Sequence, residues 1–111
     1  DVIVQIGRIF TNELRQHDNV ARWGGEEYLV LLPETNIQQA YSIAEKLRLK
    51  IEKQDFKQQQ QSFTVTVSMG VYQINTEDSI NHAITLADIG LYQAKNSGRN
   101  RTVIYTGQSS C

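Results

Sequence analysis

An acidic turn near residue 25 has the residue types and spacing that could do chemistry. It consists of four consecutive residues, Gly24, Gly25, Glu26 and Glu27. Paired glycines permit a positive φ and let a ligand approach the backbone closely, and carboxylate oxygens are ligands that Mg²⁺ prefers. The turn is therefore a candidate site for a divalent cation and its phosphates. From these four residues alone, a solvated turn whose glutamates only keep the surface soluble is the alternative.

Two short apolar stretches flank this turn and must position its carboxylates. They cover residues 20–23 and residues 28–32, and Pro33 closes the second stretch. Apolar runs of this length on either side of a glycine-containing turn predict the two strands of a hairpin. We therefore expect the flanking strands to hold the two glutamates still.

Hydrophobic periodicity predicts three helices around the hairpin. Apolar residues recur at helical spacing within residues 2–16, 37–53 and 79–96. The first stripe ends at Leu14, Asn36 is expected to cap the second helix, and Ser97-Gly98 is expected to stop the third.

Two further strands are expected in the second half of the chain. Apolar residues alternate with polar or small ones from Phe63 to Val71, which predicts a long, central strand with one buried face. A short strand is expected at residues 102–105, and the four glutamines at residues 58–61 are expected to form a polar loop. The predicted order of elements is α-β-β-α-β-α-β.

Composition narrows the class of protein. The chain has 111 residues, a net charge of −1 and 40% hydrophobic residues, which favours one α/β domain and no binding to nucleic-acid polymers. The longest apolar run, residues 28–32, is far too short to cross a membrane, and no signal peptide opens the chain. We therefore expect this segment to lie in the cytoplasm, with any membrane anchor in a preceding region. The lone Cys111 cannot form an internal disulfide.

The order of elements begins inside a helix, although a sheet covered by helices on one face commonly begins with a strand. In a ferredoxin-like β-α-β-β-α-β plan the first strand lies in the middle of the sheet. Its absence would leave buried backbone groups unpaired, at about 1–3 kcal/mol each. We therefore expect an α/β (α+β) domain with a ferredoxin-like antiparallel sheet covered by helices, from which the first strand and helix are absent.

Four further groups accompany the acidic turn. They are Arg15-x-x-Asp18, separated from Gly24 by five residues; Ser68-Met69-Gly70-Val71; Ala87-Asp88 with Leu91-Tyr92-Gln93-Ala94-Lys95; and Gly98-Arg99-Asn100. With the turn, this arrangement resembles the GGDEF family of diguanylate cyclases over essentially the whole chain. Glu26 stands where the family varies between Asp and Glu, and Tyr28 stands at the usual phenylalanine.

The resemblance implies a nucleotide-cyclase palm-like domain that condenses two GTP molecules into cyclic di-GMP and releases pyrophosphate. Each GTP would be held by one subunit of a homodimer, with Mg²⁺ or Mn²⁺ as cofactor. By resemblance, Glu26 is the metal ligand, and Glu27 acts near the attacking 3′ hydroxyl, either helping deprotonation or steadying the transition state. Gly24 and Gly25 would leave room for the nucleotide.

The resemblance also assigns roles on the third helix. Lys95 and Arg99 match the family's contacts to the terminal phosphates, and a cation at a helix end and another just past its glycine stop can converge on one anion. For either residue alone, a solvated surface charge is the alternative. Asp88 is expected to be structural, and Leu91 and Tyr92 are expected to lie in the core.

An inhibitory product site is implied at Arg15 and Asp18, where the family binds an intercalated cyclic di-GMP dimer. A guanidinium can donate two hydrogen bonds to a guanine edge, and a carboxylate can accept from guanine N–H groups. The alternative is a helix-terminal arginine that complements the helix dipole and an aspartate in the loop. Lys46 stands where some members add an arginine. Because lysine lacks the planar fork of the guanidinium, we expect weaker product inhibition than an arginine at this position would give.

The chain also departs from the family pattern. The complete domain begins with a strand whose aspartate shares the metal, followed by residues that read guanine, and this sequence contains none of them. We therefore expect residues 1–111 to form a partial GGDEF domain that is inactive by itself, with a sensor or receiver domain upstream. A catalytically silent domain that binds cyclic di-GMP, or that contacts partners, is the alternative.

Overall fold

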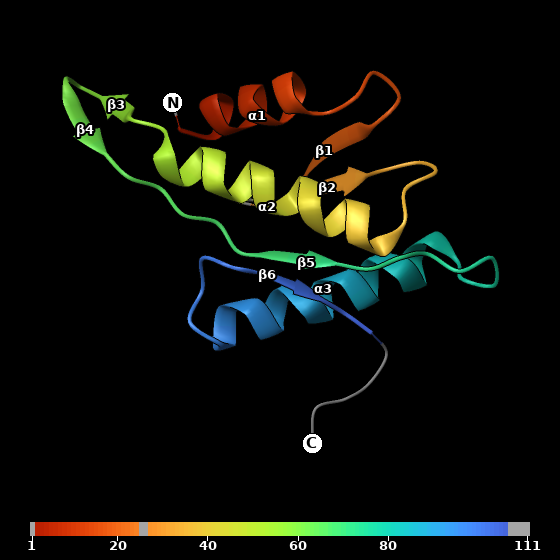
Figure 1. Cartoon of the computed structure of the whole chain (residues 1–111). Helices are drawn as coiled ribbons and strands as arrows, with labels where there is room; N and C mark the ends of the chain where they lie inside the picture. The colour runs from red at the N-terminus through yellow and green to blue at the C-terminus, as the bar shows by residue number, and fades with distance from the viewer. Residues whose placement is uncertain (1, 25–26, 107–111) are drawn as a thin grey trace.

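The computed structural model describes residues 2–24 and 27–106, and three long helices set the plan of this part (Figure 1). In order, its elements are α1 (Val2–Glu13), β1 (Asn19–Gly24), β2 (Glu27–Leu31), α2 (Ile37–Lys53), β3 (Phe56–Gln58), β4 (Gln61–Phe63), β5 (Met69–Val71), α3 (Ile80–Asn96) and β6 (Thr102–Ile104). Helix α2 lies in the middle, packed against α1 on one side and against β5 and β6 on the other.

Local sequence signals placed α2 and α3 correctly. The Asn36 side chain accepts from the Gln39 backbone N–H and the Gln39 side chain accepts from the Asn36 N–H, which closes a capping box. Ser79 caps α3 through the N–H of His82. At the other end Gly98 has a φ of +125°, and the helix stops as predicted.

Helix α1 ends at Glu13, one residue before the last apolar residue of its stripe. The Asp18 carboxylate accepts from the Arg15 backbone N–H at 2.9 Å, while the Asp18 N–H donates to the Arg15 carbonyl at 3.0 Å. These bonds form a turn that replaces the helical pattern after Leu14. Arg15 therefore lies two residues beyond the last residue of α1.

The core lies where α1, α2 and the β3–β4 hairpin meet. Its buried side chains are Ile6, Ile9, Phe10, Leu47, Ile51 and Phe56. Tyr92, which we expected in the core, is 65% exposed. The buried face of α3 is formed by Ala83, Gly90 and Ala94, and a residue two positions after Gly90 is turned by about 200° around the helix.

Strands β1 and β2 form the predicted antiparallel hairpin. Val20 pairs with Val30, Arg22 pairs with Tyr28, and Gly24 pairs with Glu27. Between the last two pairs β1 carries one extra residue, which makes a β-bulge. Gly25 and Glu26, at the tip, lie outside the described residues.

The predicted long strand from Phe63 to Val71 is wrong in its extent. Only its two ends are strands, β4 and β5, because strand structure needs a ladder partner and residues 64–68 pair with no strand in the described part of the chain. The expected glutamine loop is half correct. Gln58 pairs with Gln61, and the two glutamines between them, with φ of 53° and 67°, form the turn of the β3–β4 hairpin.

Strands β5 and β6 pair in parallel and lie on α3 (Figure 1). The α+β class with antiparallel hairpins and covering helices is confirmed, and this parallel pair is the difference from the expected all-antiparallel sheet. The contact with α3 is close because Gly70 of β5 faces Gly90. A Cβ on Gly70 would lie 2.2 Å from both the Ala87 carbonyl oxygen and the Leu91 nitrogen. In the described residues, no helix has the length and apolar character to cross a membrane.

Candidate functional site

A large cavity lies between the β1–β2 hairpin, β5 and the helices, with a volume of about 1730 Å³. This is larger than the roughly 300–1,000 Å³ of common ligand pockets. Most of its wall is apolar, but charged residues from two distant parts of the chain also line it. They include Glu27 at the start of β2 and Asp88, Lys95 and Arg99 on or just after α3.

Glu27 and Lys95 meet across this cavity. The Glu27 Oε2 lies 3.9 Å from the Lys95 Nζ, and the two side chains are 45% and 39% exposed. The pairing of Glu27 with Gly24 fixes the start of β2, and the close contact of α3 with β5 fixes the helix that carries Lys95. An exposed pair of this kind contributes about 0–1 kcal/mol, so either partner can exchange it for a ligand at little cost.

Arg99 brings a second cation to the same wall. It follows Gly98, has a φ of 63°, and is exposed. Within residues 2–24 and 27–106, its guanidinium takes part in no ion pair. Lys95 and Arg99 thus line one cavity, as convergence on one anion would require.

The metal-ligating part of the site is only partly described. Glu26, the predicted ligand, and Gly25 lie outside the described residues, and in the described ones no three His, Cys, Asp or Glu side chains cluster. Glu27 supplies a carboxylate at the cavity wall. Hard oxygen donors of this type fit Mg²⁺, which completes its coordination with waters and substrate phosphates.

Tyr28 anchors the hairpin in a way that the sequence did not reveal. Its hydroxyl donates to the Ile3 backbone carbonyl at 2.7 Å, and its ring packs edge-on against Phe10 with centroids 4.9 Å apart. The residue after Glu27 is thereby tied to the first turn of α1. A main-chain acceptor 25 residues away leaves no signal in a sequence.

Arg15 and Asp18 are paired with each other and with the loop after β2. Arg15 Nε and Nη2 each donate to the Asp18 carboxylate at 3.1 Å, and Nη2 also donates to Thr35 Oγ1 at 2.6 Å and to the Pro33 carbonyl at 3.3 Å. The Asp18 side chain is only 1% exposed, whereas that of Arg15 is 45% exposed. The hydrogen bonds from Arg15 hold the pKa of Asp18 below its usual value, and Asp18 raises the pKa of Arg15.

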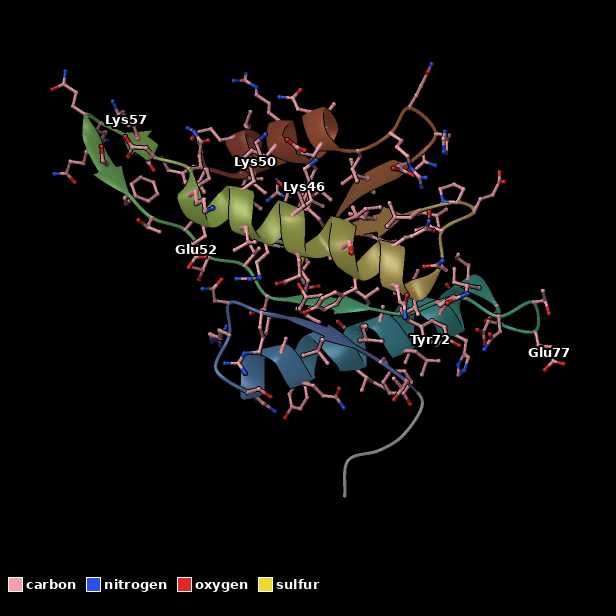
Figure 2. The ribbon with its side chains drawn as sticks, in the orientation of Figure 1. Lys46, Lys50, Glu52, Lys57, Tyr72 and Glu77 are labelled. Carbon is pink, nitrogen blue, oxygen red and sulfur yellow. The ribbon has the colours of Figure 1, made fainter. Side chains whose placement is uncertain are left out.

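Lys46 does not join Arg15 in the structure. A shallow pocket of about 390 Å³ beside Arg15 is lined by Thr35 and by Gln38, Gln39, Ser42 and Ile43 near the start of α2. Lys46 is further along α2, and its Nζ lies 3.3 Å from Glu13 Oε2. Lys50 pairs with the same carboxylate, and Figure 2 shows both lysines toward α1. These two cations lower the pKa of Glu13 through hydrogen bonds.

Comparisons with known proteins agree on one family. The family model of the diguanylate cyclase GGDEF domain matches residues 1–101. Diguanylate cyclase A of Treponema denticola is 33% identical over 104 residues, which cover 93% of this chain and 28% of that protein. Diguanylate cyclase DgcM of Escherichia coli is 37% identical over 103 residues, which cover 93% of this chain and 24% of that protein.

A solved structure shows the same fold. Diguanylate cyclase SiaD of Pseudomonas aeruginosa, in complex with its activator SiaC, matches with a TM-score of 0.88 and 36% identity, over 93% of this chain and 40% of that one. The chain therefore spans about a quarter of the length of the curated relatives above and less than half of this structure.

Proposed function

The chain belongs to the GGDEF family of diguanylate cyclases, and from this premise we propose that the protein condenses two GTP molecules into cyclic di-GMP with release of pyrophosphate. One observation carries the proposal. A carboxylate at the acidic turn and a lysine from α3 lie 3.9 Å apart on the wall of one cavity.

Lys95 and Arg99 are proposed to bind the terminal phosphates of GTP. Both are cations on one wall of the cavity, and an exposed ion pair is the only described interaction that the Lys95 amine would have to give up. A triphosphate offers each of them a stronger, charge-assisted hydrogen bond. The two side chains would therefore orient the phosphate chain along α3 and leave the ribose toward the hairpin.

Glu27 is proposed to act on the attacking 3′ hydroxyl. When the phosphates bind Lys95, the Glu27 carboxylate becomes free to accept a hydrogen bond from the 3′ hydroxyl. Glu27 would then take the proton of that hydroxyl as the new phosphodiester bond forms. We propose Mg²⁺, or Mn²⁺, as the cofactor, with Glu26 as its ligand at the turn. When bound, the cation would gather charge on the phosphate oxygens and the leaving pyrophosphate.

A dimer follows from the proposed reaction. Two GTP molecules must react twice to close the ring, so two sites, each holding one GTP, have to face each other. The Glu27 side of the cavity then has to be open to the partner's nucleotide, and the Glu27 side chain is indeed 45% exposed. We propose a homodimer as the active form.

Cyclic di-GMP is proposed to bind at Arg15 and Asp18. Arg15 is 45% exposed beside a shallow pocket, so its outer face can meet a guanine edge. The bonds to Asp18 and Thr35 would have to be exchanged for this contact. Lys46 would also have to leave Glu13 to take part, which supports product inhibition weaker than an arginine at this position would give.

The full-length protein with GTP and Mg²⁺ provides the test. We expect pyrophosphate and cyclic di-GMP to form, and Glu27→Gln to lower the rate by about 100-fold, the usual effect of removing a general base. Glu77→Gln is the matched control, because Glu77 is exposed in the loop before α3 (Figure 2). Absence of product, with binding of cyclic di-GMP retained, would refute the cyclase and support the receptor.

A further inference from the structure

The turn that carries Arg99 has an unusual backbone. Gly98, Arg99 and Asn100 have φ values of 125°, 63° and 49°, so three successive residues adopt left-handed conformations. Glycine does so freely, and asparagine does so more readily than most residues, but an arginine there requires support from its surroundings. The Arg99 N–H donates to the Ala94 carbonyl at 3.0 Å, which fixes one side of the turn to the end of α3.

Asn100 is held through all its polar groups, and we call these bonds the Asn100 clamp. Arg48 Nη1 donates to the Asn100 side-chain oxygen at 2.9 Å and to its carbonyl at 3.3 Å. The Asn100 side-chain amide donates to Glu52 Oε2 at 2.8 Å, and its backbone N–H donates to Ser68 Oγ at 3.1 Å. The clamp thus joins the turn to α2 and to the segment before β5.

Arg48 is itself fixed on α2. Its Nε and Nη2 donate to the two oxygens of Glu45 at 2.7 Å and 2.9 Å, and its side chain is only 12% exposed. A second carboxylate, Glu52, lies 3.8 Å from Nη1 and is on the side of α2 toward the 98–100 turn (Figure 2). A guanidinium held in this fork presents its Nη1 in one direction, toward Asn100 and Glu52.

We propose that Arg48 and Asn100 are positioning residues that hold Arg99 at the cavity, where it meets the terminal phosphate of GTP. Arg99 lines the same cavity as Lys95, yet its own guanidinium forms no ion pair in the described residues that would fix it. Its direction is therefore set by the backbone of the turn, and the clamp fixes that backbone one residue later. This inference rests on the proposed function, because it assigns a purpose to Arg99 in that reaction.

An exchange of two side chains tests the clamp in the full-length protein. Asn100→Asp places a carboxylate against Glu52 in place of the amide donor, and we expect the affinity for GTP to fall about tenfold. GMP, which lacks the terminal phosphates, should bind as well as to the wild type. Adding Glu52→Gln restores an amide-to-carboxylate bond with its direction reversed and the same total charge, so the double variant should recover GTP affinity.

Arg99→Ala separates positioning from general stability. If Asn100 acts through Arg99, Asn100→Asp adds nothing to the loss of GTP affinity once Arg99 is absent. If Asn100 only holds β6 in place, its loss should appear in full in the Arg99→Ala background, and GMP binding should fall as well. Either of these last results would overturn the inference.

Backbone amide NMR signals of residues 99–101 keep the two proposals distinguishable. We expect them to shift in Asn100→Asp and to return in the double variant with Glu52→Gln, whether or not nucleotide is present. Shifted amides with unchanged GTP affinity would overturn the positioning role alone. Failure of the wild-type protein to bind GTP would overturn the proposed function, and the role of Arg99 with it.

Discussion

Two charged regions of this domain differ in how many hydrogen bonds and ion pairs their side chains already form. In the cavity, Glu27 and Lys95 share one exposed contact of 3.9 Å, and Arg99 has no ion pair in the described part of the chain. At the other region, Arg15 donates to Asp18, Thr35 and Pro33, and the Asp18 side chain is 1% exposed. Groups of the first kind can take a ligand at once, whereas those of the second must first release their partners.

The two regions also depend on the scaffold differently. The cavity groups are exposed residues whose positions are set by their surroundings: strand pairing for Glu27, the contact of β5 with α3 for Lys95, and the Asn100 clamp for Arg99. Arg15 and Asp18 are themselves part of the packing, because they tie the end of α1 to the loop after β2. Substitutions should therefore separate activity from stability in the first region and change both together in the second.

Gly70→Ala should have the largest effect, because it removes the support of the cavity. The new Cβ would lie 2.2 Å from two backbone atoms of α3, which cannot move aside as a side chain could. We expect a loss of about 3 kcal/mol of unfolding free energy and no measurable GTP turnover. Urea unfolding measures the first quantity.

Gly7→Ala is the matched control for Gly70→Ala. Its Cβ would lie 3.8 Å from the Tyr28 hydroxyl, an ordinary contact, and alanine is favoured over glycine inside a helix by about 0.5–1 kcal/mol. This variant should be as stable as the wild type or slightly more stable. Equal stability of the two variants would contradict the close packing of β5 on α3.

Lys95→Ala should reduce activity without reducing stability. Loss of the cation that we propose binds the phosphates should lower kcat/KM for GTP by about 100-fold, while the exposed pair with Glu27 contributes only about 0–1 kcal/mol to folding. Lys57→Ala, in the short strand β3 away from the cavity, is the control (Figure 2). Normal product formation by Lys95→Ala would remove this residue from the site.

The sequence predicted those parts of the fold that depend on local chemistry. Asn36 and Ser79 are capping residues beside a clear helical period, and Gly98 supplies the left-handed stop, so the bounds of α2 and α3 were predictable. The extent of the strand from Phe63 to Val71 was not predictable. Alternation of apolar and polar residues indicates a half-buried segment, but it does not show whether a neighbouring strand is available to pair with it. Tyr92 was predicted to lie in the core, but it is exposed. The face of α3 that is buried is set by the close contact between Gly70 and Gly90, which the apolar residues near Tyr92 do not reveal.

The candidate site divides in the same way. The resemblance to the GGDEF family singled out Glu27, Lys95 and Arg99, and all three line one cavity. It could not identify Arg48 as a partner of Asn100, since the two are 52 positions apart and an i, i+3 pair with a glutamate describes many exposed helices. A hydrogen-bond partner that is distant in the sequence leaves a weaker signal than a residue inside a recognisable motif.

Arg15→Lys should affect both stability and ligand binding to a moderate degree. Lysine keeps the charge but cannot make the parallel bonds to Asp18 while also reaching Thr35. We expect the melting temperature to fall by a few degrees and cyclic di-GMP to bind about tenfold more weakly. Thermal unfolding and ligand titration of the full-length protein measure the two effects. A change in binding with no change in melting temperature would mean that Arg15 resembles the cavity residues after all.

The pH dependence of stability should show the smallest effect and gives the most direct measure of the paired region. Hydrogen bonds from Arg15 lower the pKa of Asp18 in the folded state. A carboxyl group with a lowered folded pKa stabilises the protein above its unfolded pKa of about 4, and this contribution is lost as pH falls through the folded pKa. The wild type should therefore lose stability more steeply than Asp18→Asn between neutral pH and acid. Because Glu13, Glu45 and Asp78 have lowered pKa values of their own, only the difference between the two curves reports on Asp18.

The carboxyl carbon signal of Asp18 isolates that titration. Its midpoint should rise toward the ordinary value in Arg15→Gln, which removes the guanidinium that donates to both carboxylate oxygens. Arg15→Lys, which keeps a charge but loses the fork, should give an intermediate midpoint. Parallel stability curves, together with an unchanged midpoint in Arg15→Gln, would show that Asp18 is not held by Arg15. The distinction between a paired region and an open cavity would then not hold for Arg15 and Asp18.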